Sequence, residues 1–514
     1  SIEVRASTRA RGWDFQLQDL FRHQTVRELA RVLVPAASTA SATPGAFSLL
    51  TAEDRAKLPP DVVDAYPLAA LQAGMVFHSE LHPESPVFHD LFSYHLRVAW
   101  NESALRAVLA AVTARHAVLR TSVRTGGFSE PLQFVHARVV MPLTVHDLTG
   151  LAPAEQESAL DAWCAAEKKR GFAWGEPPLL RVAVHRRSAT TLQFSLSLHH
   201  AILDGWSVSA LLAEVFAAYL DGLAGKSTPA AGPPPPFRDY VALERATLAS
   251  DEARRFWAAQ LDDPPAAQLP RRPDRVAPES PAQDAVFFTW PRERSAALNA
   301  FANRAGVSLK HALLAAHAKV VAHLTGSREV MTGVISNGRP ETTGAAESLG
   351  LFLNTVPCRL AVAPGTWADL ARAILRADEA VLPHRRYPLA ELQKVHGRTS
   401  LFETSFNFVH FHVLDALRAR DDLAVLGARY FDQNTFAYFA QFSADSAVGT
   451  LQLELRFDPA EFTRTQVESF VAAYDRVLGA MAVDVPARHE SLSLLDPDER
   501  RLVVETFNAA PLPA

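Results

Sequence analysis

Two adjacent histidines and an aspartate stand close together in the stretch SLHHAILDGW at residues 197–206. Imidazole titrates near neutral pH, so His199 or His200 can exchange a proton with a substrate under ordinary conditions. A histidine at a strand end can equally be a core residue that is hydrogen-bonded to backbone. A shared metal ion is disfavoured, because adjacent residues of a strand point to opposite faces. The stretch therefore predicts proton-transfer or positioning chemistry, with a structural histidine as the alternative.

A strand leads into this stretch. In TLQFSLSL at residues 191–198, apolar side chains alternate with glutamine and serine, which is the period of a half-buried strand. If the pleat continues, His199 falls on the polar face and His200 on the apolar face.

A helix follows the stretch. Asp-Gly at 204–205 marks a turn, and apolar residues recur at helical spacing from Val208 onward. Ser207 or Ser209 is the expected N-cap. The histidines are thus predicted to lie in a tight loop between two rigid elements, which is a favourable place for chemistry.

The rest of the chain predicts an α/β fold with two lobes. Its 514 residues exceed what one hydrophobic core usually organises. Helical and strand-like signals alternate, with helices expected at 102–117 and 295–323 and strands near 329–335 and 450–456. Proline-rich segments at 227–237 and 262–283 are expected to be connections, the first being the crossing between the lobes.

A small helical unit is predicted ahead of this body. Residues 16–34 carry apolar side chains at spacings of three and four, with Thr25 as an N-cap and Glu28 completing a capping box. The next segment, PAASTASATPGA at 35–46, has small residues and prolines and is expected to be a flexible linker.

Composition excludes several functional classes. Hydrophobic residues make up 48% of the chain and charged residues 21%, which is typical of a globular protein. The formal charge of −5, without a basic run, implies neither nucleic acid nor an anionic membrane as partner. Cys164 and Cys358 are too few for a disulfide framework, so a reducing cytoplasm is expected. The start, SIEVRASTRARG, is not a signal peptide, and without an initiator Met the chain is expected to be a piece of a longer protein.

HHAILDG at 199–205 resembles the His-His-x-x-x-Asp-Gly signature of condensation domains of nonribosomal peptide synthetases and of related chloramphenicol-acetyltransferase-like acyltransferases. The resemblance covers about residues 60 to 490, because further segments are similar to the family's other motifs and occur in the family's order. These are YPLAALQAGMVFHSEL at 66–81, RHAVLRTSV at 115–123 with Ala117 where glutamate is usual, FRDYVALE at 237–244, SNGRPE at 336–341, LGLFLNTVPCRL at 349–360, HRRYPLAEL at 384–392 and SFNFV at 405–409.

The resemblance implies an α/β fold of two chloramphenicol-acetyltransferase-like lobes, at 61–232 and 233–488, in a V-shaped pseudo-dimer with a central tunnel. It implies peptide-bond formation in nonribosomal peptide synthesis. The α-amine of an acceptor aminoacyl thioester would attack the carbonyl of a donor thioester. Both substrates would arrive on peptidyl carrier domains, upstream and downstream, tethered by covalent 4′-phosphopantetheine, and no metal is required.

The flanks also resemble parts of such a synthetase. Residues 1–34 resemble the C-terminal part of a peptidyl carrier domain, and Ser1 matches its phosphopantetheine attachment serine, although a helix N-cap is another role for such a serine. On this resemblance the carrier fragment is all-α, residues 35–60 are a linker, and residues 489–514 begin the connector to an adenylation domain.

Site roles follow from the same motif matches. His200 is implied to lie beside the attacking amine, removing its proton or holding it in line by a hydrogen bond. Asp204 is implied to pair with Arg339 across the lobes and to hold the loop that presents His200. His199 would support this loop, and Gly205 would let the chain turn close to the substrate. Supporting or tunnel-lining roles are expected for a further set, namely Trp206, Ser207, Asn354, Tyr387 and Ser405.

Other functions share parts of this pattern. An epimerisation domain has the histidine motif but differs from LGLFLNT in its second lobe, and an acyltransferase that uses coenzyme A would not follow carrier-like residues. A non-catalytic recruitment module would lack His200 or Asp204. Within the condensation class, YPLAALQAGMVFH and HHAILDGWS resemble the subtype that takes a D-configured donor. No epimerisation domain separates the carrier-like residues from the body, so a D residue loaded directly or an achiral donor is expected.

Overall fold

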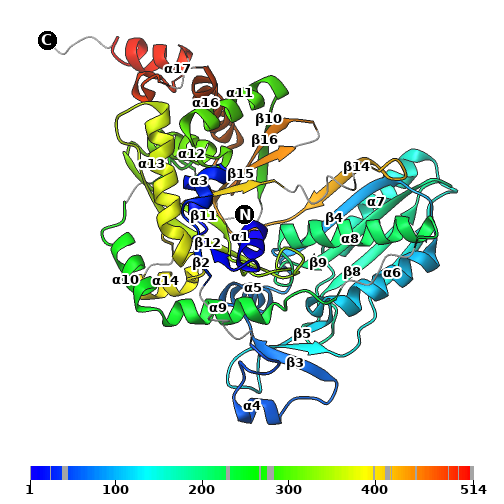
Figure 1. Cartoon of the computed structure of the whole chain (residues 1–514). Helices are drawn as coiled ribbons and strands as arrows, with labels where there is room; N and C mark the ends of the chain where they lie inside the picture. The colour runs from blue at the N-terminus through cyan, green and yellow to red at the C-terminus, as the bar shows by residue number, and fades with distance from the viewer. Residues whose placement is uncertain are drawn as a thin grey trace.

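Two α/β lobes form the main body of the protein (Figure 1). The computed structural model describes residues 2–23, 25–36, 44–226, 232–265, 268–274, 283–397, 400–410, 417, 420–445, 448–483, 486–495 and 497–509. We call the lobe built around the five-stranded sheet the N-lobe and the lobe built around the six-stranded sheet the C-lobe. The α/β class expected from the sequence is confirmed.

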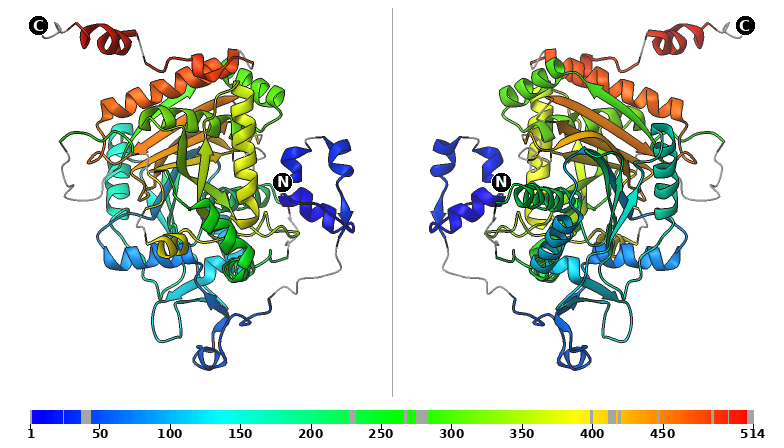
Figure 2. Two further views of the ribbon diagram at one scale, coloured as in Figure 1. Left: turned by 90° about the vertical axis from the view of Figure 1, so that its left-hand side faces the viewer. Right: turned by 90° about the vertical axis from the view of Figure 1, so that its right-hand side faces the viewer.

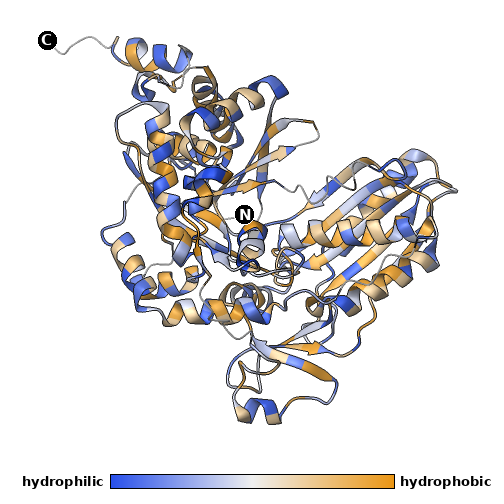
Figure 3. Ribbon diagram, in the orientation of Figure 1, coloured by the Kyte–Doolittle hydropathy of each residue, from blue (hydrophilic) through white to orange (hydrophobic). Residues whose placement is uncertain are grey.

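The N-lobe sheet has the strand order β14-β4-β9-β8-β7, and all neighbours are antiparallel except β7 and β8. Helices α6 and α8 pack on it, and both carry hydrophobic as well as hydrophilic residues (Figure 3). The elements are β4 (His89–Arg97), α6 (Glu102–Arg115), η1 (Ala117–Arg120), β7 (Leu143–Asp147), α7 (Pro153–Glu167), β8 (Leu180–Arg186), β9 (Thr191–His199) and α8 (Gly205–Leu223), with β14 (Ala424–Phe431) coming from far along the chain. By length and composition α8 could cross a membrane, but much of it is buried against this sheet, as in a core helix.

Strand β9 is buried on both faces, not on one as its alternating sequence predicts. On the polar face, Ser93 and His89 of β4 form hydrogen bonds with two serines of β9. Ser93 and Ser195 share a hydrogen bond of 2.7 Å between hydroxyls, and His89 Nε2 lies 2.8 Å from Ser197 Oγ. Polar side chains are thus placed inside the sheet with partners, which removes the usual cost of burying them.

A smaller sheet, β3-β6-β5, lies at the base of the N-lobe. Residues 47–58, which belong to the expected linker, pack their apolar side chains against it instead of extending into solvent. The elements here are α4 (Ala52–Ala56), β3 (Val62–Pro67), α5 (Ala70–Leu81), β5 (Thr121–Arg124) and β6 (Leu132–His136). After the proline-rich segment, α9 (Arg238–Ala249) and α10 (Asp251–Gln260) lead into the C-lobe.

The C-lobe sheet has the order β10-β16-β15-β13-β11-β12, and helices α11, α12, α13 and α16 contribute to its core. Its elements are β10 (Asp284–Trp290), α11 (Arg292–Ala305), α12 (Leu309–Thr325), β11 (Glu329–Asn337), β12 (Leu353–Ala361), α13 (Trp367–Val381), η2 (Leu382–His384), α14 (Leu389–His396), β13 (Thr404–Val409), β15 (Tyr438–Asp445), β16 (Thr450–Phe457) and α16 (Arg464–Val483). Beyond them lie η4 (His489–Ser491), α17 (Pro497–Arg501) and η5 (Leu502–Thr506).

The single helix expected over 295–323 is in fact two helices. Gly306 adopts a left-handed conformation, with φ of 70°, and ends α11, and Ser308 then occupies the N-cap position of α12. Glycine reaches this conformation without the strain that a side chain would add, so the chain turns here although the apolar spacing continues. The strands expected near 329–335 and 450–456 are confirmed as β11 and β16.

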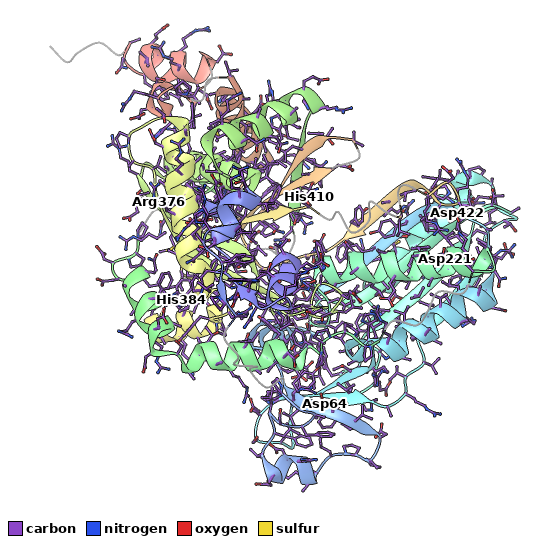
Figure 4. The ribbon with its side chains drawn as sticks, viewed as in Figure 1. Asp64, Asp221, Arg376, His384, His410 and Asp422 are labelled. Carbon is purple, nitrogen blue, oxygen red and sulfur yellow. The ribbon has the colours of Figure 1, made fainter. Side chains whose placement is uncertain are left out.

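Strand β14 joins the two lobes, because it follows the C-lobe strand β13 in sequence but pairs with β4 at the edge of the N-lobe sheet. Arg420, just before β14, makes ion pairs with Asp221 at the end of α8 (3.0 Å) and with Asp422 (2.8 Å), and these two aspartates lie at the far end of the N-lobe (Figure 4). The Tyr430 ring packs edge-on against Phe92 and Tyr94 of β4. We call residues 420–431 the strap.

A separate small unit precedes the main body and lies beside it (Figure 2). It contains α1 (Ile2–Arg9), α2 (Asp19–Arg22), α3 (Val26–Ala30) and the short pair β1 (Trp13–Asp14) and β2 (Val34–Pro35). Thr25 caps α3 as predicted, since its hydroxyl accepts from the Glu28 backbone N–H at 3.2 Å. The unit touches the C-lobe through ion pairs of Arg22 with Glu379 (3.0 Å) and Arg5 with Glu341 (3.9 Å).

The packing around β11 predicts the effect of one added methyl group. A Cβ at buried Gly333 would meet the Phe402 ring, and would lie 2.8 Å from Thr355 Cγ2. We expect Gly333→Ala to lower the free energy of unfolding by about 1–3 kcal/mol, because the neighbours must shift. At exposed Gly126 a Cβ would meet nothing within 4 Å, so Gly126→Ala is the matched control and should change stability by less than about 0.5 kcal/mol. Equal urea midpoints for the two variants would contradict the packing described here.

Candidate active site

A large cavity lies between the lobes, with a volume of about 1740 Å³. Both lobes contribute polar and apolar side chains to its wall. Among the lining residues are Asp90, Phe92, His200 and Trp206 from the N-lobe and Asn354, Asn407, His410 and Gln441 from the C-lobe. His410 lies at the end of β13, between the lobes (Figure 4). The cavity is therefore lined by polar and apolar groups from both lobes.

The histidine stretch enters this cavity from the end of β9. Helix α8 begins immediately after it, and its N-cap is Asp204, not Ser207 or Ser209 as predicted. The Asp204 carboxylate accepts from the Ser207 backbone N–H at 2.7 Å, which places Ser207 inside the helix. Aspartate and serine are both good caps, so composition alone does not separate them. Gly205 is the first residue of α8 and lines the cavity.

Asp204 and Arg339 form the inter-lobe ion pair that the motif match implies. Both side chains are 1% exposed, and the guanidinium donates from Nη1 to Oδ2 at 3.1 Å and from Nη2 to Oδ1 at 3.3 Å. The backbone N–H of Phe352 also donates to Oδ2 at 3.1 Å, and the Phe352 ring lies 4.2 Å from the guanidinium carbon. A buried carboxylate is thus satisfied on both oxygens by charge-assisted hydrogen bonds.

Backbone and hydroxyl contacts extend this junction. Ser207 Oγ donates to Gly350 O at 2.8 Å, and Arg339 Nη2 donates to Ser207 Oγ at 2.6 Å. The Asp204 backbone N–H donates to Gly350 O at 3.0 Å. The Trp206 indole Nε1 donates to Ala346 O at 3.1 Å, so this side chain both lines the cavity and ties α8 to the C-lobe.

His199 is held inside the N-lobe. Its Nδ1 accepts from the Ala201 backbone N–H at 3.1 Å, so the ring proton sits on Nε2 and donates to Ser79 Oγ at 3.0 Å. Burial lowers the pKa of His199 to about 3, with the neighbouring His200 adding to the effect. His199 is therefore neutral and shapes the loop, while His200 points to a different neighbour. The two rings are not arranged to share a metal ion.

His200 has an aspartate partner that the sequence analysis missed. Its Nδ1 lies 2.7 Å from Asp90 Oδ2, and 26% of its side chain is exposed, compared with 5% for Asp90. Burial alone would lower the pKa of His200, but the Asp90 carboxylate outweighs it and raises this pKa to about 9. The sequence contains one signal for this residue. In HDLFSYHL, Asp90 alternates with Phe92, Tyr94 and Leu96, so it is a charged residue on an otherwise apolar strand face.

The remaining predicted residues have contacts or burial that indicate supporting roles. Asn354 Nδ2 donates to the carbonyls of Arg385 and Tyr387 at 2.9 and 2.7 Å, so it fixes the cavity wall. Ser405 and Tyr387 are buried. Among the residues of RHAVLRTSV, Arg115 and His116 both bond Glu214 on α8, each at 2.8 Å, which gives them a structural role. Ser1 lies outside the described residues.

Comparisons with known proteins show the family to which the chain belongs. A protein-family model described as "Condensation domain" matches residues 62–504. The AMB antimetabolite synthetase AmbE of Pseudomonas aeruginosa is 35% identical over 99% of this chain and 24% of its own length. A linear gramicidin synthase polypeptide of Brevibacillus parabrevis is 28% identical over 86% of this chain and 9% of its own length. The chain thus spans a quarter or less of these relatives.

Solved structures show the same fold. The condensation domain from the Monacolin K polyketide synthase MokA superposes with a TM-score of 0.71 at 16% identity, covering 83% of this chain and 99% of that one. The first condensation domain of the calcium-dependent antibiotic synthetase, in complex with a substrate analogue, gives a TM-score of 0.69 at 20% identity, covering 84% of this chain and 100% of that one.

The Asp204–Arg339 pair predicts a large stability effect. Arg339→Ala would leave a buried carboxylate without its counter-charge, so we expect the free energy of unfolding to fall by about 3–5 kcal/mol. Arg359→Ala is the matched control, because Arg359 and its partner Glu329 are 27% and 44% exposed, and the loss there should be below about 1 kcal/mol. Urea unfolding measures both. Similar losses in the two variants would show that the inter-lobe pair is not buried as described.

Proposed function

We infer the function of this chain from one premise: it belongs to the condensation-domain family of nonribosomal peptide synthetases. We propose that its main body forms peptide bonds, the amine of an acceptor aminoacyl thioester attacking the carbonyl of a donor peptidyl thioester. The observation that carries this proposal is the His200 ring, which lines the cavity between the lobes on a loop locked by the Asp204–Arg339 pair.

The arrangement of the cavity supports a reaction between two tethered substrates. We propose that the lobes form a V-shaped pair of chloramphenicol-acetyltransferase-like units, with a central tunnel that admits phosphopantetheine arms from opposite sides. A volume of about 1740 Å³ is larger than the usual pocket for one small ligand, which supports a chamber for two arms.

His200 is the residue that we place beside the reacting amine and carbonyl. Holding these groups in line contributes up to about 7–11 kcal/mol in well-oriented reactions, so positioning supplies a large part of the acceleration for an already reactive thioester. Proton transfer by a side chain typically adds about 10²- to 10⁴-fold. Asp204 and Arg339 act through the loop, and His199 acts through its hydrogen bonds to Ser79 and Ala201.

The partners belong to the same proposal. Residues 1–34 are proposed to be the C-terminal part of a carrier domain, with Ser1 as the attachment point of its phosphopantetheine. The ion pairs of Arg5 and Arg22 with the C-lobe support this, because they show that the unit can rest on the body. A second carrier domain downstream would bring the acceptor, and residues 489–514 would lead to an adenylation domain.

Removal of the imidazole should slow catalysis without unfolding the protein. With donor and acceptor carrier proteins loaded in excess, we expect His200→Ala to reduce the rate of dipeptidyl-thioester formation about 10²- to 10⁴-fold. Intact mass spectrometry of the carriers measures the product, and the melting temperature checks the fold. His323→Ala is the matched control, since His323 is exposed in the last turn of α12. A wild-type rate in His200→Ala would refute the role of this ring.

Donor configuration is a separate prediction. Because the motif segments resemble the D-donor subtype, donors that end in a D residue or in glycine should give product faster than donors that end in an L residue. The experiment offers the three donors on the same carrier with one acceptor and compares initial rates by intact mass. A strong preference for the L donor would remove this part of the proposal.

A further inference from the structure

The carboxylate of Asp90 is placed to control His200. It is almost fully buried, at 5% exposure, near the start of β4, and its Oδ2 lies 2.7 Å from His200 Nδ1. A carboxylate buried this deeply needs a compensating positive charge or hydrogen-bond donor, and the imidazole ring supplies it. The contact leaves Nε2 on the opposite edge of a ring that lines the cavity.

Strand pairing explains why the contact is well defined. Asp90 stands directly opposite Leu198 in the β4–β9 ladder, so His200, two residues further along, is its diagonal neighbour on the same face. The His200 backbone N–H donates to Phe88 O at 2.7 Å. Both the main chain and the ring of His200 are thus held by the start of β4, and rotation of the ring would break the bond to a buried carboxylate.

The charged groups around the ring favour its protonated form. Asp432, which follows the strap, and Asp204, which caps α8, also raise the pKa of His200, but each is already paired with an arginine. Asp432 bonds Arg456, which Glu454 also contacts, and Asp204 bonds Arg339. His199 on the adjacent position is neutral. Asp90 is therefore the anion in direct contact with His200.

We propose that Asp90 is the positioning residue of His200. Its carboxylate accepts a hydrogen bond from Nδ1–H, which directs Nε2 to the cavity and keeps the ring protonated. Nε2–H then donates a hydrogen bond to the thioester carbonyl oxygen. The inference rests on the proposed function and deepens it, because it assigns His200 as a hydrogen-bond donor and proton carrier instead of a free base. Asp90 acts through His200, with which it shares the hydrogen bond described above.

The proton balance of the step follows from this assignment. The lone pair of the neutral amine attacks the donor carbonyl carbon, a C–N bond forms, and the carbonyl oxygen becomes anionic while it accepts from Nε2–H. Collapse re-forms the C=O bond, breaks the C–S bond and releases the pantetheine thiolate. The thiolate takes the Nε2 proton and becomes a thiol, and Nε2 recovers a proton from the positively charged nitrogen. The products are a neutral amide and a thiol, with His200 unchanged.

Histidine titration tests the pair without requiring activity. In the full chain with ¹³C-labelled histidine, the NMR signal that disappears in His200→Gln is that of His200. We expect it to titrate well above the ordinary value of about 6.5, and to move down by about 1–3 pH units in Asp90→Asn. Asp147→Asn, at the opposite edge of the N-lobe sheet, is the matched control and should leave it unmoved. A wild-type His200 titrating at or below 6.5 would overturn the proposal, even if Asp90→Asn failed to fold.

The pH dependence of the reaction tests the role. Single-turnover rates at saturating carriers should fall at high pH as His200 loses its proton, and Asp90→Asn should move this alkaline limb to lower pH by about 1–3 units. A free base would behave in the opposite way, because Asp90→Asn would then shift the acidic limb and be faster near pH 7. That result, or identical profiles, would overturn the inference. Absence of product from the wild type would instead refute the proposed function, while the NMR titration would still decide the pairing.

Discussion

A single buried ion pair, Asp204 with Arg339, fixes the geometry on which the rest of the site depends. The Asp204 carboxylate caps α8 and accepts hydrogen bonds from both Nη atoms of Arg339 and from the Phe352 backbone N–H. One side chain therefore sets both the start of a helix and the distance between the two lobes. Such a pair adds little net stability over a well-packed apolar contact, because both charges must be desolvated. The pair instead fixes the relative orientation of the two lobes, because a guanidinium and a carboxylate form two hydrogen bonds only over a narrow range of orientations.

Most of the motifs in the sequence converge on this junction, although they are far apart along the chain. Tyr240 of FRDYVALE packs so closely on Gly338 of SNGRPE that a Cβ there would lie 2.7 Å from its ring. Arg386 of HRRYPLAEL donates to the carbonyls of Gly338 and Arg339 at 2.7 and 2.9 Å, and bonds Glu341 at 2.9 Å. These segments build the wall behind Arg339. In the proposed function, the chemistry is assigned to the His200 ring, which follows directly after β9.

The sequence predicts features that depend on local pattern or on a known motif, and it fails where the partner is distant. Strand β9, helix α6 and the Thr25 cap follow from spacing and propensity, and the Asp204–Arg339 pair follows from the motif match. The parity of HDLFSYHL places Asp90 on an otherwise apolar strand face, but it does not say that this strand lies beside β9, and the Asp90–His200 contact depends on that pairing. The predicted N-cap of α8 is wrong because Asp204 serves as cap and as inter-lobe partner at once. Residues 424–431 carry a weak apolar pattern, so their pairing with the other lobe could not be predicted.

The strap has a consequence for how the protein matures on the ribosome. Strand β4 is synthesised early, and β9 soon pairs with one of its edges, but its other edge stays open until residues 424–431 have been made. An open edge with unpaired N–H and C=O groups is a template for pairing with other chains. During translation the N-lobe therefore has an unpaired strand edge. Nascent chains on one polysome would be most prone to aggregate through this edge before the C-lobe is nearly complete. Slow elongation through the second lobe would lengthen this vulnerable interval.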